Sequence, residues 1–198
     1  PSFVKILANY QYKNPDVTFD IDLSGRKINL VEEGFDLALR VTADLDEGLI
    51  ARKFTQVEFQ LVAAPSFLNR VKRPEAADDL NGAPMLAYSQ VASDGRIRFG
   101  SVNGLDVKLK PVMVSGNENL LHISALAGMG DAMLPNWVTR NDIATGRLEL
   151  VLPEIDGPKL HVNAIYADRS YLPAKTRSFL DYLAGPKGLS SVIQEHCK

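Results

Sequence analysis

The stretch Ile28–Thr42, INLVEEGFDLALRVT, decides the fold class of this 198-residue chain. Its first half has apolar residues at helical spacing, Ile28, Val31 and Phe35, and this spacing predicts a short amphipathic helix. Gly34 stands where a helix ends and the backbone needs a positive φ. The apolar run that follows is typical of a strand buried on both faces. The stretch therefore predicts a helix joined tightly to a buried strand.

Polar residues come at the carboxyl end of that strand, in Arg40-Val41-Thr42. Ligands of open α/β sheets bind at the carboxyl ends of strands. Upstream, Phe3–Tyr10 has helical spacing, and Val17–Leu23 alternates apolar and polar residues as a strand does. Helices and strands that alternate through short connections are typical of a mostly parallel sheet. We therefore predict an α/β fold.

The pattern changes near residue 85 and returns near residue 166. Arg96–Phe99 and Leu105–Lys110, separated by Asn103-Gly104, predict an antiparallel hairpin in the middle region. We therefore expect two lobes, with the second inserted into the first and two crossings between them. The expected boundaries are residues 1–84 plus 167–198 for lobe I and residues 85–166 for lobe II.

A second helix start lies in the middle region, at Ser115-Gly116-Asn117-Glu118. The spacing of Ser115 and Glu118 is that of a capping box, which predicts Ser115 as the N-cap. The segment Asn119–Ala127 is apolar almost all round, so we expect a helix buried on every side.

Composition narrows the class of protein. The net charge is −2 and the pI is near 6.0, which argues against direct nucleic-acid binding by these residues. No apolar run approaches the roughly 18 residues that a membrane helix needs. One cysteine, Cys197, excludes an internal disulfide and fits a reducing cytoplasm.

The sequence contains no convincing catalytic or metal-binding arrangement. It has no GxSxG elbow and no phosphate-binding loop, and Gly128-Met129-Gly130 follows a helix instead of opening one. His122, His161 and His196 are scattered without metal-ligand spacing, so we expect structural roles for them. We expect no cofactor, no metal site and no enzymatic activity.

Three loop ends remain as a candidate binding site: Ser24-Gly25, Arg40-Val41-Thr42 and Ser115-Gly116-Asn117. A helix N-terminus with free N–H groups and hydroxyl caps attracts anions. Hydroxyls and amides that converge on it would hold a small carboxylate. The alternative is that Ser115 only caps its helix and Ser24 only makes a turn, and the sequence leaves both interpretations open.

Four blocks resemble, in order and spacing, the regulatory domain of LysR-type transcriptional regulators. They are residues 29–40 (NLVEEGFDLALR), residues 61–68 (LVAAPSFL), residues 127–153 with AGMG, LPNW, GRL and VLP, and residues 172–183 with LPAK and FLDYL. Each block is weak alone, but four in order are specific.

The resemblance implies the fold of type 2 periplasmic binding proteins: two Rossmann-like lobes with mixed, mostly parallel sheets, two crossovers and an effector in the cleft. It implies a bacterial, cytoplasmic regulator that forms dimers and tetramers through these domains. DNA would be bound only by a helix-turn-helix domain upstream, and a first regulatory strand is expected just before Pro1.

Two departures from the family pattern affect the site. Asn29 stands where the family commonly has Asp, which removes a charge but keeps the capacity to hydrogen-bond. Asp131 stands where the family has an aliphatic residue. A buried, unpaired carboxylate costs several kcal/mol. We therefore expect Asp131 to find a partner, face solvent or meet a ligand.

These observations favour the effector-sensing and oligomerisation domain of a LysR-type regulator, with a small carboxylate or aromatic effector. The residues predicted to bind it are Ser24, Gly25, Arg40, Val41, Thr42, Ser89, Ser115, Gly116, Asn117 and Asp131. For Arg40 a structural role carries equal weight. The alternative function is a periplasmic solute-binding protein of a transporter, which shares the fold class.

Overall fold

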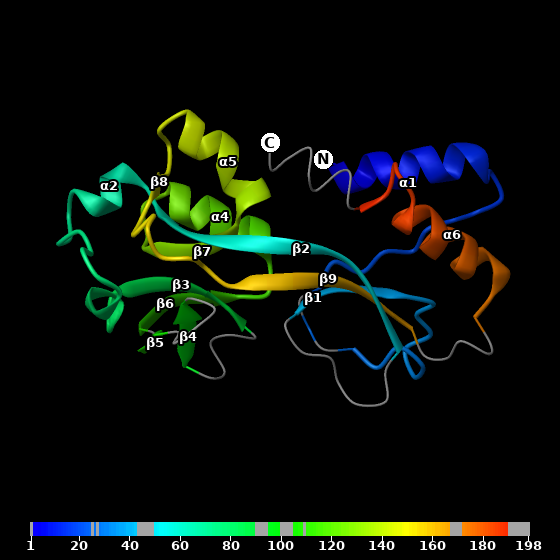
Figure 1. Cartoon of the computed structure of the whole chain (residues 1–198), viewed down its shortest axis with the longest axis horizontal. Helices are drawn as coiled ribbons and strands as arrows, with labels where there is room; N and C mark the ends of the chain where they lie inside the picture. Colours follow the sequence, from blue (N-terminus) through cyan, green and yellow to red (C-terminus); the bar gives the residue numbers. More distant parts are fainter. Residues whose placement is uncertain are drawn as a thin grey trace. The chain divides into compact units, whose positions relative to one another are not determined.

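A computed structural model describes residues 2–24, 26, 28–42, 50–89, 95–99, 105–108, 110–166 and 172–189 (Figure 1). The chain forms two compact units. Unit 1 consists of Pro1–Asp22, Lys27–Val57 and Leu160–Lys198, and unit 2 of Leu23–Arg26 and Glu58–Lys159.

Unit 1 joins a small sheet to two packed helices. Its elements are α1 (Ser2–Lys13), β1 (Ala38–Thr42), the first half of β2 (Ile50–Ala63), β9 (Lys159–Tyr166) and α6 (Ala174–Ala184). Strand β1 pairs antiparallel with β9. Figure 1 shows α1 beside α6, where the ring of Tyr10 packs edge-on against Phe179 at a centroid distance of 4.9 Å. Helix α1 therefore confirms the helix predicted near the N-terminus.

Two other predictions for unit 1 are wrong. Val17–Leu23 belongs to no strand, and the expected helix from Ile28 is a single turn. In this turn the Phe35 N–H donates to the Leu30 carbonyl at 2.9 Å, and Gly34 closes it with φ 74°. The glycine does what the sequence predicted. Gly34 ends the turn one residue before Phe35, so the segment from Ile28 forms a single turn and no longer helix.

Unit 2 is an α/β unit. Its elements are the second half of β2, α2 (Pro65–Leu68), η1 (Ala77–Leu80), β3 (Pro84–Tyr88), β4 (Arg96–Phe99), β5 (Leu105–Lys108), β6 (Lys110–Ser115), α4 (Glu118–Leu126), β7 (Asp131–Pro135), α5 (Asn136–Ala144) and β8 (Glu149–Leu150). Strand β3 runs parallel to both β6 and β7, whereas β2 runs antiparallel to β7 and β8. The mixed α/β class and the β4–β5 hairpin are as predicted.

The two faces of this sheet carry different cores because side chains alternate along each strand. On β7, Leu134 belongs to the core that includes Leu121 of α4, whereas Met133 belongs to the core that includes Val107 of the hairpin. Figure 1 shows α4 and α5 on one side of the strands and β4 and β5 on the other.

Helix α4 is less buried than predicted. Leu121 and Ala125 are fully buried, but Leu120 is 47% exposed and Ile123 is 61% exposed. The helix therefore covers the sheet with one side only, although its sequence is apolar almost all round.

The unit boundaries also differ from the expected ones. The chain leaves unit 1 after Val57, inside β2, and returns at Leu160, inside β9. The expected exchanges were after residues 84 and 166. The reason is that Leu61 and Val62 are core residues of unit 2, packed with residues of β3 and β7. Within the described part of the chain, no helix is long and apolar enough to cross a membrane.

Candidate functional site

The carboxyl ends of β3 and β6 meet at one edge of unit 2. The two strands are parallel, and Tyr88 lies opposite Ser115. Ser89 follows the first strand, and Gly116 and Asn117 follow the second and lead into α4. The structure therefore brings together four of the predicted ligand-binding residues, Ser89, Ser115, Gly116 and Asn117, which we call the strand-end cluster.

The N-cap of α4 is Asn117 and not Ser115, so the predicted cap is wrong by two residues. Asn117 Oδ1 accepts a hydrogen bond from the Leu120 N–H at 3.1 Å. Ser115 Oγ accepts one from the Asn117 N–H at 3.0 Å and so shapes the turn before the helix. The helix begins at Glu118, three residues after Ser115, and a cap must directly precede the first helical residue.

These bonds use side-chain oxygens as acceptors. The hydroxyl hydrogen of Ser115 and the amide hydrogens of Asn117 take no part in them. Both side chains therefore keep donor capacity beside the positive end of the α4 dipole. Such a group of donors suits a ligand that accepts hydrogen bonds.

A carboxyl that the sequence interpretation did not assign to the site belongs to Glu118, the first residue of α4. Burial raises the pKa of Glu118, while a hydrogen bond from Trp137, the charge of His122 and the nearby Tyr88 act in the opposite direction. Burial, followed by the charge of Glu118, also raises the pKa of Tyr88. The sequence spacing had pointed to Glu118 only as a capping-box partner, because the aromatic residues come from other elements.

Asp131 lies at the opposite edge of the sheet. It faces Met85 at the start of β3, whereas the strand-end cluster is level with Tyr88. At about 3.3 Å per residue, the two levels are about 10 Å apart. Asp131 is 1% exposed, its Oδ1 has no hydrogen-bond partner among the described residues, and burial raises its pKa to about 7.

The predicted residues of unit 1 lie within β1 and not beyond its end. Arg40 is opposite Asn163, Val41 opposite Val162, and Thr42 opposite His161. Thr42 is the last residue of β1, so Arg40, Val41 and Thr42 form the carboxyl end of the strand, as predicted. The Arg40 guanidinium donates to the Ile28 carbonyl at 3.1 Å, which supports the structural role that we weighed for it.

The remaining predicted residues are Ser24 and Gly25. Ser24 is exposed and belongs to the short segment assigned to unit 2. Gly25 is outside the described residues.

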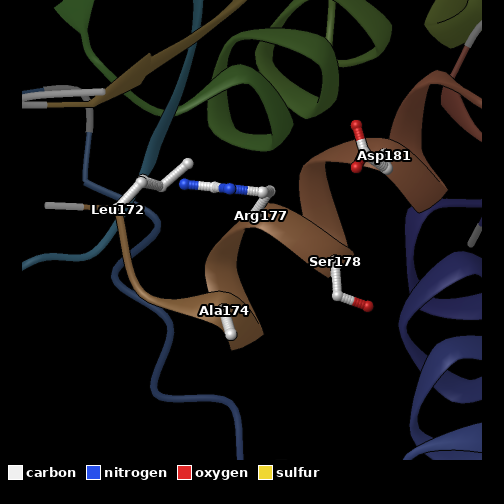
Figure 2. Close-up of a pocket in the computed structure, with 5 residues that line it drawn as sticks. All are labelled: Leu172, Ala174, Arg177, Ser178 and Asp181. Carbon is white, nitrogen blue, oxygen red and sulfur yellow. The ribbon is translucent and has the colours of Figure 1, made fainter. Parts of the chain in front are cut away.

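Two surface hollows are separate from all of these residues. One, of about 490 Å³, lies over α6 and is lined by Leu172, Ala174, Arg177, Ser178 and Asp181 (Figure 2). Arg177 points toward Leu172, whereas Asp181 forms an ion pair with Arg52 at 2.8 Å. The other, of about 400 Å³, lies beside Arg73 and Leu152. Both are open surface depressions, so we place the candidate site at the strand-end cluster.

The described residues contain no group of three or more histidine, cysteine, aspartate or glutamate side chains that could hold a metal ion. His122 Nε2 lies 2.6 Å from Asp142 Oδ2, and His161 lies in β9. His196 and Cys197 are outside the described residues.

Comparison with known proteins decides the family. The family model described as the LysR substrate binding domain matches residues 2–185. This chain belongs to the LysR family. The resemblance to LysR-type regulators is thereby confirmed.

Curated relatives of this LysR domain are transcriptional regulators. The chain is 29% identical over 170 residues to an uncharacterized HTH-type regulator of Haemophilus influenzae, covering 85% of this chain and 59% of that protein. It is 29% identical over 184 residues to CrgA of Neisseria meningitidis, covering 92% of this chain and 62% of that protein. The chain thus spans about three fifths of these relatives. They are regulators and not enzymes, as we predicted for this chain.

Solved LysR-type regulatory domains share the fold. The CrgA regulatory domain from Neisseria meningitidis superposes with a TM-score of 0.73 at 26% identity, covering 92% of this chain and 90% of that one. A variant regulatory domain of AphB from Vibrio vulnificus gives a TM-score of 0.74 at 23% identity, covering 92% and 91%. The predicted α/β fold of the periplasmic-binding-protein type is therefore confirmed.

Proposed function

We propose that the strand-end cluster of unit 2 binds the small-molecule effector of this LysR-type regulatory domain. LysR-type regulators bind small molecules, form oligomers and contact DNA through an N-terminal domain. The observation that carries the proposal is the meeting of Ser89, Ser115, Gly116 and Asn117 at the carboxyl ends of two parallel strands.

The chemistry of the cluster favours a small carboxylate. Ser115 and Asn117 retain donors at the start of α4, where the helix dipole stabilises negative charge. Aromatic side chains stand nearby: the rings of Phe59 and Tyr88 pack edge-on at 6.3 Å. An aromatic carboxylate would use both kinds of contact.

Arg40 and Thr42 are proposed as additional contacts from unit 1, on the strength of the family resemblance. They lie on the same strand of unit 1, opposite Asn163 and His161. Thr42 would donate or accept one hydrogen bond. Arg40 would contact the effector in addition to holding the Ile28 carbonyl.

We further propose that the effector acts by shifting a population. A ligand that binds one arrangement of the two units better than another favours that arrangement by its difference in affinity. In a cytoplasmic dimer or tetramer, the shift would change the spacing of the DNA-binding domains and so control transcription.

A thermal-shift screen of small carboxylates and aromatics tests the site. We expect at least one compound to raise the unfolding temperature of the wild type. The shift should shrink in Ser115→Ala and in Thr42→Val, both of which should remain folded. Ser178→Ala, on the exposed side of α6, is the matched control and should respond like the wild type. An undiminished shift in both site variants would rule out the proposed contacts.

A further inference from the structure

A buried amide oxygen in strand β9 of unit 1 lacks a hydrogen-bond donor. Asn163 is 1% exposed, and its Oδ1 has no hydrogen-bond partner among the described residues. A buried acceptor that bonds neither protein nor water costs free energy, so folded proteins keep few of them and each calls for an explanation. The contacts proposed above make no use of this oxygen.

The amide of Asn163 is held in one orientation. Its Nδ2 donates a hydrogen bond to the His161 carbonyl at 3.0 Å. The opposite orientation would turn Oδ1 toward this carbonyl, where two acceptors would meet and the bond would be lost. The atom left without a partner is therefore an acceptor, and only a hydrogen-bond donor can satisfy it.

Asn163 shares one face of the sheet with two of the residues that we propose as effector contacts. It lies opposite Arg40 in the antiparallel pair of β1 and β9, and Thr42 lies opposite His161. Side chains two residues apart on a strand point to the same face, so Asn163 is also on the face of Thr42. Directly opposite Cβ atoms are about 4.5–5.5 Å apart and diagonal neighbours about 7–8 Å apart, so one small molecule could contact all three side chains.

The other face of this strand pair is occupied by apolar packing. Ala164 lies opposite Leu39, and both pack in the core cluster that contains Leu180 of α6. Because side chains alternate along a strand, Arg40 and Asn163 point away from this cluster.

We propose that Asn163 Oδ1 accepts a hydrogen bond from the effector, and that the effector is therefore a carboxylate that also carries a hydroxyl or amino group. An ionised carboxylate alone offers only acceptors and would leave this oxygen unpaired. A site built to bond a hydroxyl or amino group discriminates strongly against the analogue that lacks it. The oxygen is covered in the structure, so the side chains around it move aside when the donor binds.

This inference rests on the proposed function, because Arg40 and Thr42 are effector contacts only there. It adds the chemical class of the effector and a residue that selects it. The experiments below are chosen so that the inference can fail while the proposed function stands.

The first experiment compares three probes on the wild-type chain by titration calorimetry: mandelate, phenylacetate and α-methoxyphenylacetate. Mandelate carries a hydroxyl donor, phenylacetate has only hydrogen at that position, and the methoxy compound keeps the oxygen without its hydrogen. Mandelate should bind at least about tenfold more tightly than either of the others. Lactate and propionate form a second pair without the ring and should differ in the same direction. Equal affinities within both sets overturn the inference.

The second experiment removes the acceptor. Asn163→Leu keeps a similar volume without the oxygen, and Asn163→Ala removes the oxygen without adding bulk. In both variants the preference for mandelate over phenylacetate should fall to about threefold or less. Asn9→Leu, at an exposed position of α1 in the same unit, is the matched control and should keep the wild-type preference. A lower unfolding midpoint with the preference intact would assign Asn163 a structural role and overturn the inference.

The outcomes separate this inference from the proposed function. If carboxylates bind but their hydroxylated analogues bind no better, the proposed function stands, the inference fails and an ordered water is the donor to Oδ1. If no carboxylate, with or without a hydroxyl group, raises the unfolding temperature, the proposed function fails and the inference fails with it.

Discussion

Met85 of β3 and Asp131 of β7 lie opposite each other in parallel strands, at the edge of the sheet away from the α4 start. Met85 is fully buried and belongs to the hairpin-side core. The Asp131 carboxyl is consequently placed beside apolar side chains, and its Oδ1 lacks a partner among the described residues. Of the outcomes expected for Asp131, the structure shows neither exposure to solvent nor a partner for this oxygen.

Asp131→Asn should stabilise the domain in a pH-dependent way. Burial raises the pKa of Asp131 from 3.8 to about 7, so between these values the folded chain retains a proton that the unfolded chain has released. The free energy of unfolding therefore falls as pH rises through this window. At about 1.4 kcal/mol per pKa unit, the variant should gain up to about 4 kcal/mol at pH 8 and almost nothing at pH 4.

Denaturant unfolding at pH 4, 6 and 8 measures this difference. Asp156→Asn, which removes an exposed carboxyl of the same unit, is the control and should follow the wild type at each pH. A constant difference between Asp131→Asn and the wild type across the three pH values would contradict the prediction.

Asn117→Ala should destabilise unit 2 more than Ser115→Ala does. Asn117 Oδ1 caps α4, and loss of an N-cap costs about 0.5–2 kcal/mol. Ser115 only supports the preceding turn through the Asn117 N–H, so its loss should cost less. Chemical unfolding of the two variants measures how much each substitution lowers the free energy of unfolding. The reverse order would restore Ser115 as the cap.

Gly157→Ala should disturb the backbone hydrogen bond that joins Phe59 to the segment before β9. A Cβ at residue 157 would stand 2.0 Å from the Phe59 carbonyl oxygen, and the Phe59 N–H donates to the Pro158 carbonyl at 3.0 Å. Overpacking of this kind costs about 1–3 kcal/mol. Thermal unfolding should show a lower midpoint than in the wild type. Ser178→Ala serves as the tolerated comparison, and an equal midpoint in both variants would refute the close approach.

Arg40→Gln should lower the free energy of unfolding by about 1 kcal/mol, because the bond from its guanidinium to the Ile28 carbonyl is lost. Arg96→Gln, on the exposed side of β4, is the control and should cost little. The Arg40→Gln variant also separates a structural role of Arg40 from a role in binding the ligand. A retained effector-induced thermal shift assigns it a structural role, and a lost shift with the fold intact assigns it to the ligand.

Local sequence patterns predicted the elements that form from residues close together in the sequence. The N-terminal helix α1, the β4–β5 hairpin and α4 were all expected, because apolar periodicity and turn residues report local geometry. The same logic failed for Val17–Leu23, where alternation is present but no strand forms. Alternation alone does not supply a neighbouring strand to pair with.

The candidate site was predicted in part. Ser89, Ser115, Gly116 and Asn117 were expected near strand ends, and the structure places them at one edge. Glu118 was not assigned to the site, because its burial comes from residues of β3 and α5. Asp131 was grouped with them because a carboxylate stands where the family has an aliphatic residue, but Asp131 begins β7 at the other edge.

The sequence by itself determined the family, the α/β class and the order of most elements, since these depend on local periodicity and on blocks of residues in order. Only the tertiary structure decided that Asn117 caps α4, that His122 meets Asp142 and that Asp131 faces Met85. Strand register and helix packing bring residues together across large separations in the chain, and no local pattern records which partners will meet.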